Sequence, residues 1–119
     1  MSELAMVIED DEDLATIFTE ALQAAQYEVE TIRDGLVAQN RLKETIPQVI
    51  ILDMHLPGVD GADLIAQIRE DPRLVKTIVV IATADARMGE TYTEIADFVL
   101  IKPIAFTQLR DLTARLHKR

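Results

Sequence analysis

Residues 49–61 read VIILDMHLPGVDG, and this stretch decides the fold. Its first four residues are all apolar, which is typical of a parallel strand covered on both faces. The run ends in an acidic residue, Asp53. After it, Gly58 and Gly61 are expected to serve turn geometry, and Asp60 is expected to cap a helix. The stretch therefore predicts a buried strand with a carboxylate at its carboxyl end.

Four other segments read as strands. Residues 4–8, 78–82 and 98–101 are continuous apolar runs like 49–52, and we expect the same two-sided cover for them. Each run is followed directly by a polar residue. Residues 28–32 alternate between polar and apolar side chains instead, which is typical of an edge or half-covered strand.

Helical patterns separate these strands. Apolar residues at helical spacing predict helices over 14–25, 36–45, 62–70 and 109–116, and 87–95 reads as a short, poorly patterned helix. The acidic residues Asp11, Glu12 and Asp13 suit the positive end of the first helix. Five strands alternating with five helices predict an α/β fold: a doubly wound, flavodoxin-like, five-stranded parallel sheet with helices on both faces, (βα)5.

Composition narrows the function. The chain has 119 residues, which fits one domain over residues 1–119, and 49% of them are hydrophobic, enough for a core. There is no cysteine, so thiolate chemistry is excluded, and we expect a cytoplasmic protein. A formal charge of −9 argues against direct binding to nucleic acid or to a membrane surface.

Polar residues at the strand ends are expected to meet, because ligands of such sheets bind at the carboxyl ends of the strands. These residues are Glu9, Asp10, Asp53, Thr83 and Lys102. Oxygen ligands without His or Cys favour Mg²⁺, with Mn²⁺ possible. A carboxylate nucleophile, a metal ion, an ammonium group and a hydroxyl are the parts needed for phosphoryl transfer through an aspartyl phosphate.

With these groups in place, the chain resembles the receiver domains of two-component response regulators over essentially its whole length. The matching stretches are residues 7–14, 50–61, 81–84 and 102–103. The resemblance implies a signalling switch that promotes only its own phosphorylation and dephosphorylation. It also implies a histidine kinase or histidine phosphotransfer protein as phosphodonor, an unknown downstream protein as a second partner, and a homodimer as one option. We expect residues 1–119 to contain no output domain.

The resemblance also implies roles in the metal site. Asp53 resembles the phosphorylated aspartate and is itself a metal ligand. Asp10 resembles the direct ligand of the acidic pair, and Glu9 the member that acts through water. His55 falls where the family offers a backbone carbonyl to the metal, so its imidazole is expected to face solvent.

Further roles follow from the same resemblance. Thr83 resembles the switch hydroxyl, and Lys102 the lysine that meets the phosphoryl group. Pro103 resembles the family's cis-proline, and Ala84 leaves room for the donor.

Two features depart from the family. Receiver domains often carry an aromatic residue three positions before the lysine, where this chain has Val99. The neighbouring aromatic, Phe98, is expected on the opposite face of its strand. The stretch from Thr83 to Lys102 is also slightly short, and we expect the fourth helix to lose residues.

Three other functions would require residues or losses that this sequence does not show. A haloacid-dehalogenase-type phosphatase would carry a second aspartate where His55 stands. A flavodoxin-like FMN binder would carry a Ser/Thr/Gly-rich loop where this chain has an acidic run. An inert interaction domain would have lost the chemical groups, all of which are present here.

Overall fold

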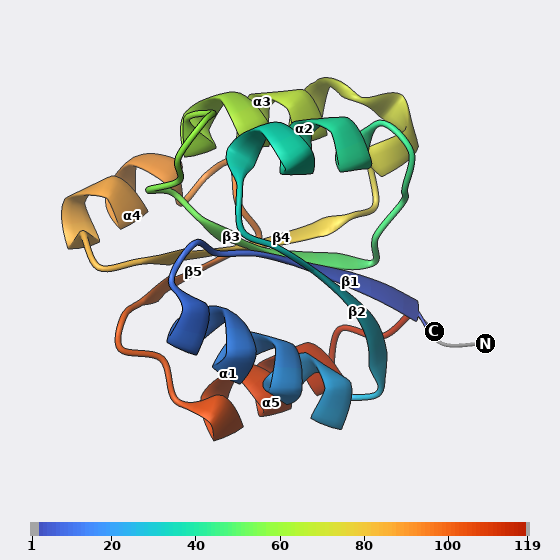
Figure 1. Cartoon of the computed structure of the whole chain (residues 1–119), viewed down its shortest axis with the longest axis vertical. Helices are drawn as coiled ribbons and strands as arrows, with labels where there is room; N and C mark the ends of the chain where they lie inside the picture. Colours follow the sequence, from blue (N-terminus) through green and yellow to red (C-terminus); the bar gives the residue numbers. More distant parts are fainter. Residues whose placement is uncertain (1–2, 119) are drawn as a thin grey trace.

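The computed structural model describes residues 3–118, and its five strands form one parallel sheet in the order β2-β1-β3-β4-β5 (Figure 1). The strands are β1 (Glu3–Ile8), β2 (Tyr27–Ile32), β3 (Val49–Asp53), β4 (Ile78–Thr83) and β5 (Phe98–Ile101). The order reverses between β1 and β3, where doubly wound sheets bind their ligands. The predicted fold class is confirmed, and so is the edge position of β2.

The helices cover both faces of the sheet. They are α1 (Glu12–Ala24), α2 (Gly35–Leu42), α3 (Gly61–Glu70), α4 (Ala86–Tyr92) and α5 (Phe106–Ala114), with a 3-10 turn η1 (Pro72–Leu74) before β4. Figure 1 shows α1 and α5 on one face and α2, α3 and α4 on the other. As expected, α4 is short: it has seven residues, fewer than any other α-helix among residues 3–118. None of these helices is long and apolar enough to cross a bilayer.

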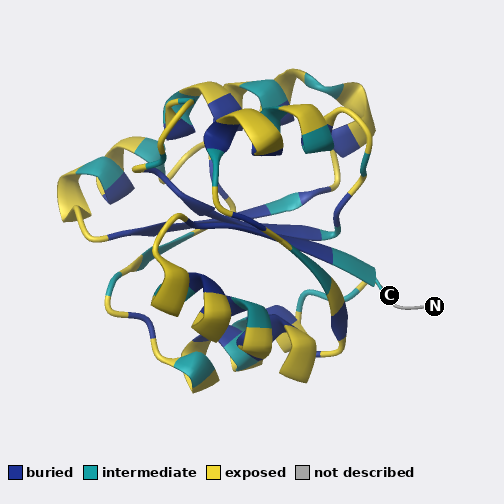
Figure 2. Cartoon of the chain, in the orientation of Figure 1, coloured by how far each residue is buried: buried dark blue, intermediate teal, exposed yellow. Residues whose placement is uncertain are grey.

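The core is divided in two by the sheet (Figure 2). Side chains alternate along each strand, so Met6 and Ile8 of β1 face α2 and α3, while Ala5 and Val7 face α1 and α5. The central strands follow the same alternation. Phe18 of α1 packs in the core layer between the sheet and helices α1 and α5. Burial on both faces explains why these strands read as continuous apolar runs.

Aspartates begin four of the helices. Asp11 accepts a hydrogen bond from the amide of Leu14, and Asp60 accepts one from the amide of Ala62, so Asp60 caps α3 as predicted. Asp34 and Asp85 cap α2 and α4 in the same way. Each cap satisfies an amide at the helix start and places a carboxylate near the positive end of the helix. All four lie at the carboxyl edge of the sheet, because each of these helices follows a strand.

The predicted two-sided cover of residues 98–101 is wrong. β5 is the second edge of the sheet, and Phe98 and Ile101 are 37% and 44% exposed. An uninterrupted apolar run does not distinguish a central strand from an edge strand whose apolar side chains reach the surface.

The two glycines of the decisive stretch have different roles. Gly58 has φ +90°, so the turn requires its left-handed backbone, as predicted. The turn interpretation of Gly61 is wrong. A Cβ there would lie 2.7 Å from Cα of Met54 and 2.8 Å from its carbonyl oxygen. Gly61 therefore allows the start of α3 to approach the end of β3.

This contact predicts that two Gly→Ala changes lower the free energy of unfolding by unequal amounts. Gly61→Ala is expected to destabilise the protein by about 1–3 kcal/mol, because the backbone that it meets cannot yield. Gly89→Ala within α4 is expected to cost less. Its Cβ would meet side-chain atoms and no backbone, Cγ1 of Val99 at 2.9 Å and the flexible end of Ile101 at 3.1 Å, and alanine favours a helix by about 1 kcal/mol. Urea unfolding of both variants tests the order, and an equal or greater loss in Gly89→Ala contradicts it.

Candidate functional site

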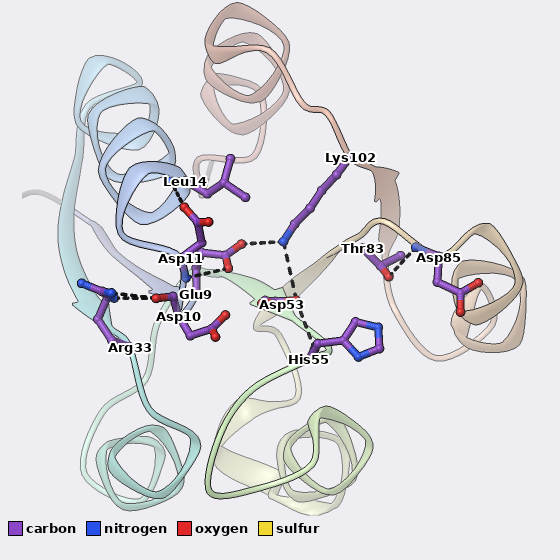
Figure 3. A network of polar contacts seen from close by, with 10 residues as sticks. All are labelled: Glu9, Asp10, Asp11, Leu14, Arg33, Asp53, His55, Thr83, Asp85 and Lys102. Atoms are coloured by element: carbon purple, nitrogen blue, oxygen red, sulfur yellow. Dashed lines mark hydrogen bonds and ion pairs between the residues drawn. The ribbon is translucent and has the colours of Figure 1, made fainter.

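The carboxyl ends of β1, β3, β4 and β5 meet at one edge of the sheet, and the predicted site residues lie there (Figure 3). Glu9 follows β1 directly, Asp53 and Thr83 are the last residues of β3 and β4, and Lys102 follows β5. The register explains this convergence: Ile8 pairs with Leu52, so Glu9 stands level with Asp53.

Three carboxylates form the centre of the site. Glu9, Asp10 and Asp53 each offer an oxygen, and these oxygens lie within 4.8 Å of one another. Glu9 and Asp53 are 1% and 4% exposed, whereas Asp10 is exposed. The buried carboxylates lie in the interior end of the site, and Asp10 lies at its opening.

Lys102 supplies the positive charge. Its Nζ lies 2.8 Å from Oε1 of Glu9 and 3.6 Å from Oδ1 of Asp53. The other oxygen of Glu9 accepts a hydrogen bond from the amide of Asp11 at 3.2 Å. Both oxygens of Glu9 are therefore engaged, one by an ammonium group and one by the backbone that begins α1.

Burial raises the pKa of Glu9 to about 7. Desolvation is the main cause, because it disfavours the charged form, and the neighbouring Asp53 raises the pKa further. Lys102 and the Asp11 amide act in the opposite direction without cancelling these effects. Near neutral pH the site therefore stands between two protonation states.

Asp53 is oriented by its own turn. Its Oδ1 accepts a hydrogen bond from the backbone amide of His55 at 3.1 Å. The His55 side chain is exposed, and Figure 3 shows its ring pointing away from the carboxylates, as predicted. Between them, Met54 is buried in the core and anchors the turn. The amide contact was not predicted, although an aspartate often bonds the backbone two residues further on.

Thr83 connects the site to α4. Its side chain is completely buried, and its hydroxyl accepts a hydrogen bond from the amide of Asp85 at 3.1 Å. The carboxylate of Asp85 in turn accepts from the amides of Arg87 and Met88. Asp53 pairs with Ala82, so Thr83 lies one residue beyond the ladder partner of Asp53. Its hydroxyl, the predicted switch group, is bonded directly to the residue that caps α4. The bond between Lys102 and Pro103 is cis, as expected.

Arg33 belongs to the site and was missed. It follows β2 and donates from Nε and Nη2 to the backbone carbonyl of Asp10, at 3.0 and 2.7 Å (Figure 3). The available signal was its position, since the residue after a predicted strand lies at the same edge as the carboxylates.

The donor set fits Mg²⁺. It consists of carboxylate oxygens, which hard cations prefer. In an octahedron with bonds of about 2.1 Å, ligand oxygens lie about 3 to 4.2 Å apart, so the observed spacing requires only a small contraction. Both oxygens of Glu9 are held by Lys102 and Asp11, and Oδ1 of Asp53 is held by the His55 amide, whereas the exposed carboxylate of Asp10 lies at the opening of the site.

The fold and the site agree with a comparison against protein families. Residues 5–114 match the family described as response regulator receiver domain. The chain belongs to the response regulator receiver domain family. This receiver domain is therefore a signalling module, and its acidic pocket is consistent with the metal site of that family.

Individual relatives support the assignment. The receiver domain is 34% identical over 106 residues to the phosphate regulon transcriptional regulatory protein PhoB of Rhizobium meliloti, covering 87% of this chain and 47% of that protein. It is 31% identical over 90 residues to the polar-differentiation response regulator DivK of Brucella ovis, covering 76% of this chain and 73% of DivK. The receiver domain thus spans about half of the length of PhoB.

A solved structure agrees in fold. The chemotaxis response regulator CheY4 of Vibrio cholerae superposes with a TM-score of 0.84 at 23% identity, covering 98% of this chain and all of CheY4.

The raised pKa of Glu9 predicts how stability depends on pH. A carboxyl whose folded pKa of about 7 exceeds its ordinary 4.5 favours folding when protonated. That stability is present below pH 4.5 and is lost as the pH rises to about 7, at a cost of at most roughly 3 kcal/mol.

Urea unfolding in EDTA at pH 5 and pH 8 tests this for the wild type and Glu9→Gln. We expect the free energy of unfolding of the wild type to fall relative to Glu9→Gln as the pH rises. Glu20→Gln, an exposed change on α1, should track the wild type. Parallel curves for wild type and Glu9→Gln contradict the prediction.

Proposed function

We propose that Asp53 accepts a phosphoryl group, in a Mg²⁺-dependent reaction, from a phosphohistidine of a histidine kinase or histidine phosphotransfer protein. The observation that carries this proposal is the surroundings of Asp53. Its carboxylate ends a buried strand and is fixed by the His55 amide, with Lys102 on one side and two further carboxylates on the other. Such a carboxylate, beside a group of metal-binding oxygens and an ammonium group, would serve as the nucleophile of phosphoryl transfer.

The reaction balances without a further reagent. A carboxylate oxygen of Asp53 attacks the phosphorus, the new O–P bond forms, and the N–P bond to the donor imidazole breaks. The leaving nitrogen keeps the electron pair and takes a proton from water. Lys102, 3.6 Å from Asp53, is placed to pair with a phosphoryl oxygen as negative charge arrives.

The metal would neutralise phosphoryl oxygens and hold them in line with the nucleophile. The carboxylates of Asp10 and Asp53 and the backbone carbonyl of His55 would hold it. Glu9 would act through water, because both its oxygens are already engaged by Lys102 and Asp11. The clustering of their oxygens supports the roles of Glu9, Asp10 and Asp53, whereas the role of the His55 carbonyl rests on membership of the family.

Thr83 would pass the signal on. When its hydroxyl turns to donate to a phosphoryl oxygen, it gives up the hydrogen bond from the Asp85 amide. Asp85 caps α4, so the change reaches the start of that helix. The phosphoryl group then biases the loop between two arrangements, which is how a local charge becomes a signal to a downstream protein.

Phosphorylation of Asp53 can be measured directly. Incubation with Mg²⁺ and acetyl phosphate is expected to add one phosphoryl group to the wild type, measured as intact mass. The addition should disappear in EDTA and in Asp53→Asn, which keeps the shape of the side chain and removes the nucleophile. A folded wild type that gains no mass would overturn the proposal and favour an inert interaction domain.

The role of the Thr83 hydroxyl in the switch can be tested separately. Thr83→Ala is expected to be phosphorylated, because the hydroxyl is not the nucleophile, but to lose the response of Asp85. In wild type and Thr83→Ser, the backbone amide resonance of Asp85 should move on phosphorylation, measured by NMR. In Thr83→Ala it should move much less, since the hydrogen bond to be released is already gone. An equal movement in all three would show that Thr83 does not transmit the change.

A further inference from the structure

Arg33 forms two hydrogen bonds to the backbone of Asp10, a member of the acidic cluster. Both its Nε and Nη2 donate to the carbonyl oxygen of Asp10, at 3.0 and 2.7 Å, so the planar guanidinium fixes the direction of that peptide (Figure 3). The neighbouring residues are held differently: Glu9 by the backbone of Ile32, and Asp11 by its place at the start of α1. Arg33 holds the peptide of the one exposed carboxylate in the cluster.

The residues after Arg33 hold the other loop of the site. Asp34 caps α2, and the amide of Gly35 donates to the carbonyl of Pro57 at 3.0 Å. A Cβ at Gly35 would lie 2.8 Å from the amide nitrogen of Val59, so the turn and that loop are in close contact. The turn 33–35 therefore contacts both the loop that carries Asp10 and the loop that follows Asp53.

We propose that Arg33 is a positioning residue that holds the Asp10 carboxylate in place to bind Mg²⁺. This inference rests on the proposed function for the identity of the ion, and it concerns metal affinity, which is measured without phosphoryl transfer. Arg33 acts through the backbone of Asp10, so its two-pronged geometry matters more than its charge.

The charge of Arg33 and its hydrogen-bonding geometry predict opposite effects on the affinity for Mg²⁺. As a positive charge near the site, Arg33 repels Mg²⁺, and its removal would tighten binding. Through its two hydrogen bonds, Arg33 already restricts the conformational freedom of Asp10 before the ion binds. Binding then costs less entropy, so loss of Arg33 should weaken it. Lysine keeps the charge and loses the fork, so Arg33→Lys separates the two effects.

The experiment is calorimetric titration of Mg²⁺ into wild type, Arg33→Lys and Arg33→Ala at physiological salt, where surface charge is screened. We expect the Kd to rise about 3- to 10-fold in both variants, at or below the roughly 10-fold that begins the range for partners of metal ligands. The matched control is Arg73→Lys, because Arg73 also donates to a backbone carbonyl, that of Leu42 at 2.7 Å, away from the site. Its Kd should equal that of the wild type.

A second measurement separates positioning from general damage. The rate of phosphorylation by acetyl phosphate should require more Mg²⁺ for half its maximum in Arg33→Lys, and should recover to the wild-type rate at saturating Mg²⁺. Unfolding in urea without metal identifies a variant that is simply unstable.

The outcomes are distinct. An unchanged Kd in Arg33→Lys, or tighter binding in Arg33→Ala, overturns the positioning role. A wild type that binds Mg²⁺ but takes no phosphoryl group defeats the proposed function and leaves the Kd comparison to decide on Arg33. A wild type that binds no Mg²⁺ overturns both.

Discussion

The gathering of three carboxylates at one edge of the sheet is the constraint on which the rest of the site depends. Two unit charges 4.8 Å apart repel by about 3 kcal/mol at an effective dielectric constant of 20. Three carboxylates and one ammonium group leave a formal charge of −2 when Lys102 is counted. A proton on Glu9 offsets part of this excess, and the pKa of Glu9 is raised to about 7 mainly because burial desolvates its carboxylate, with a further contribution from Asp53. A divalent cation would offset all of this charge, so the formal charge of −2 matches that of the proposed Mg²⁺.

The sheet produces this arrangement through its register. Parallel neighbours end almost level, with Asp53 opposite Ala82 and Thr83 opposite Ile101. The amide of Lys102 donates to the carbonyl of Thr83 at 2.7 Å, which continues the ladder one step beyond β5. Side chains far apart in sequence thus meet because burial of the strand side chains in the two core layers fixes the register. The loops add orientation, through the His55 amide on Asp53 and the grip of Arg33 on Asp10.

Much of this could be predicted because apolar runs and the residues that end them are local signals. The fold class and the convergence of Glu9, Asp53 and Lys102 followed from where strands stop. What could not be predicted depends on neighbours in space. The exposure of β5 depends on its being last in the sheet, and the need for Gly61 depends on how closely α3 approaches β3. The role of Arg33 depends on which carbonyl lies across the loop, and no periodicity reports that.

The departure at Val99 can now be interpreted physically. Val99 is half-buried on the α4 side of β5, and a Cβ on Gly89 would lie 2.9 Å from its Cγ1. Helix α4 therefore lies against β5 so closely that an aromatic ring at 99 would have no room to swing inward without moving the helix. Phe98 cannot take that part, because its partner in the ladder, Val80, faces α1 and α5. The coupling that we propose from Thr83 needs no ring, since the hydroxyl is already bonded to Asp85 and Asp85 caps α4. In this receiver domain a short helix held by its own cap would take the role that the aromatic residue has elsewhere in the family.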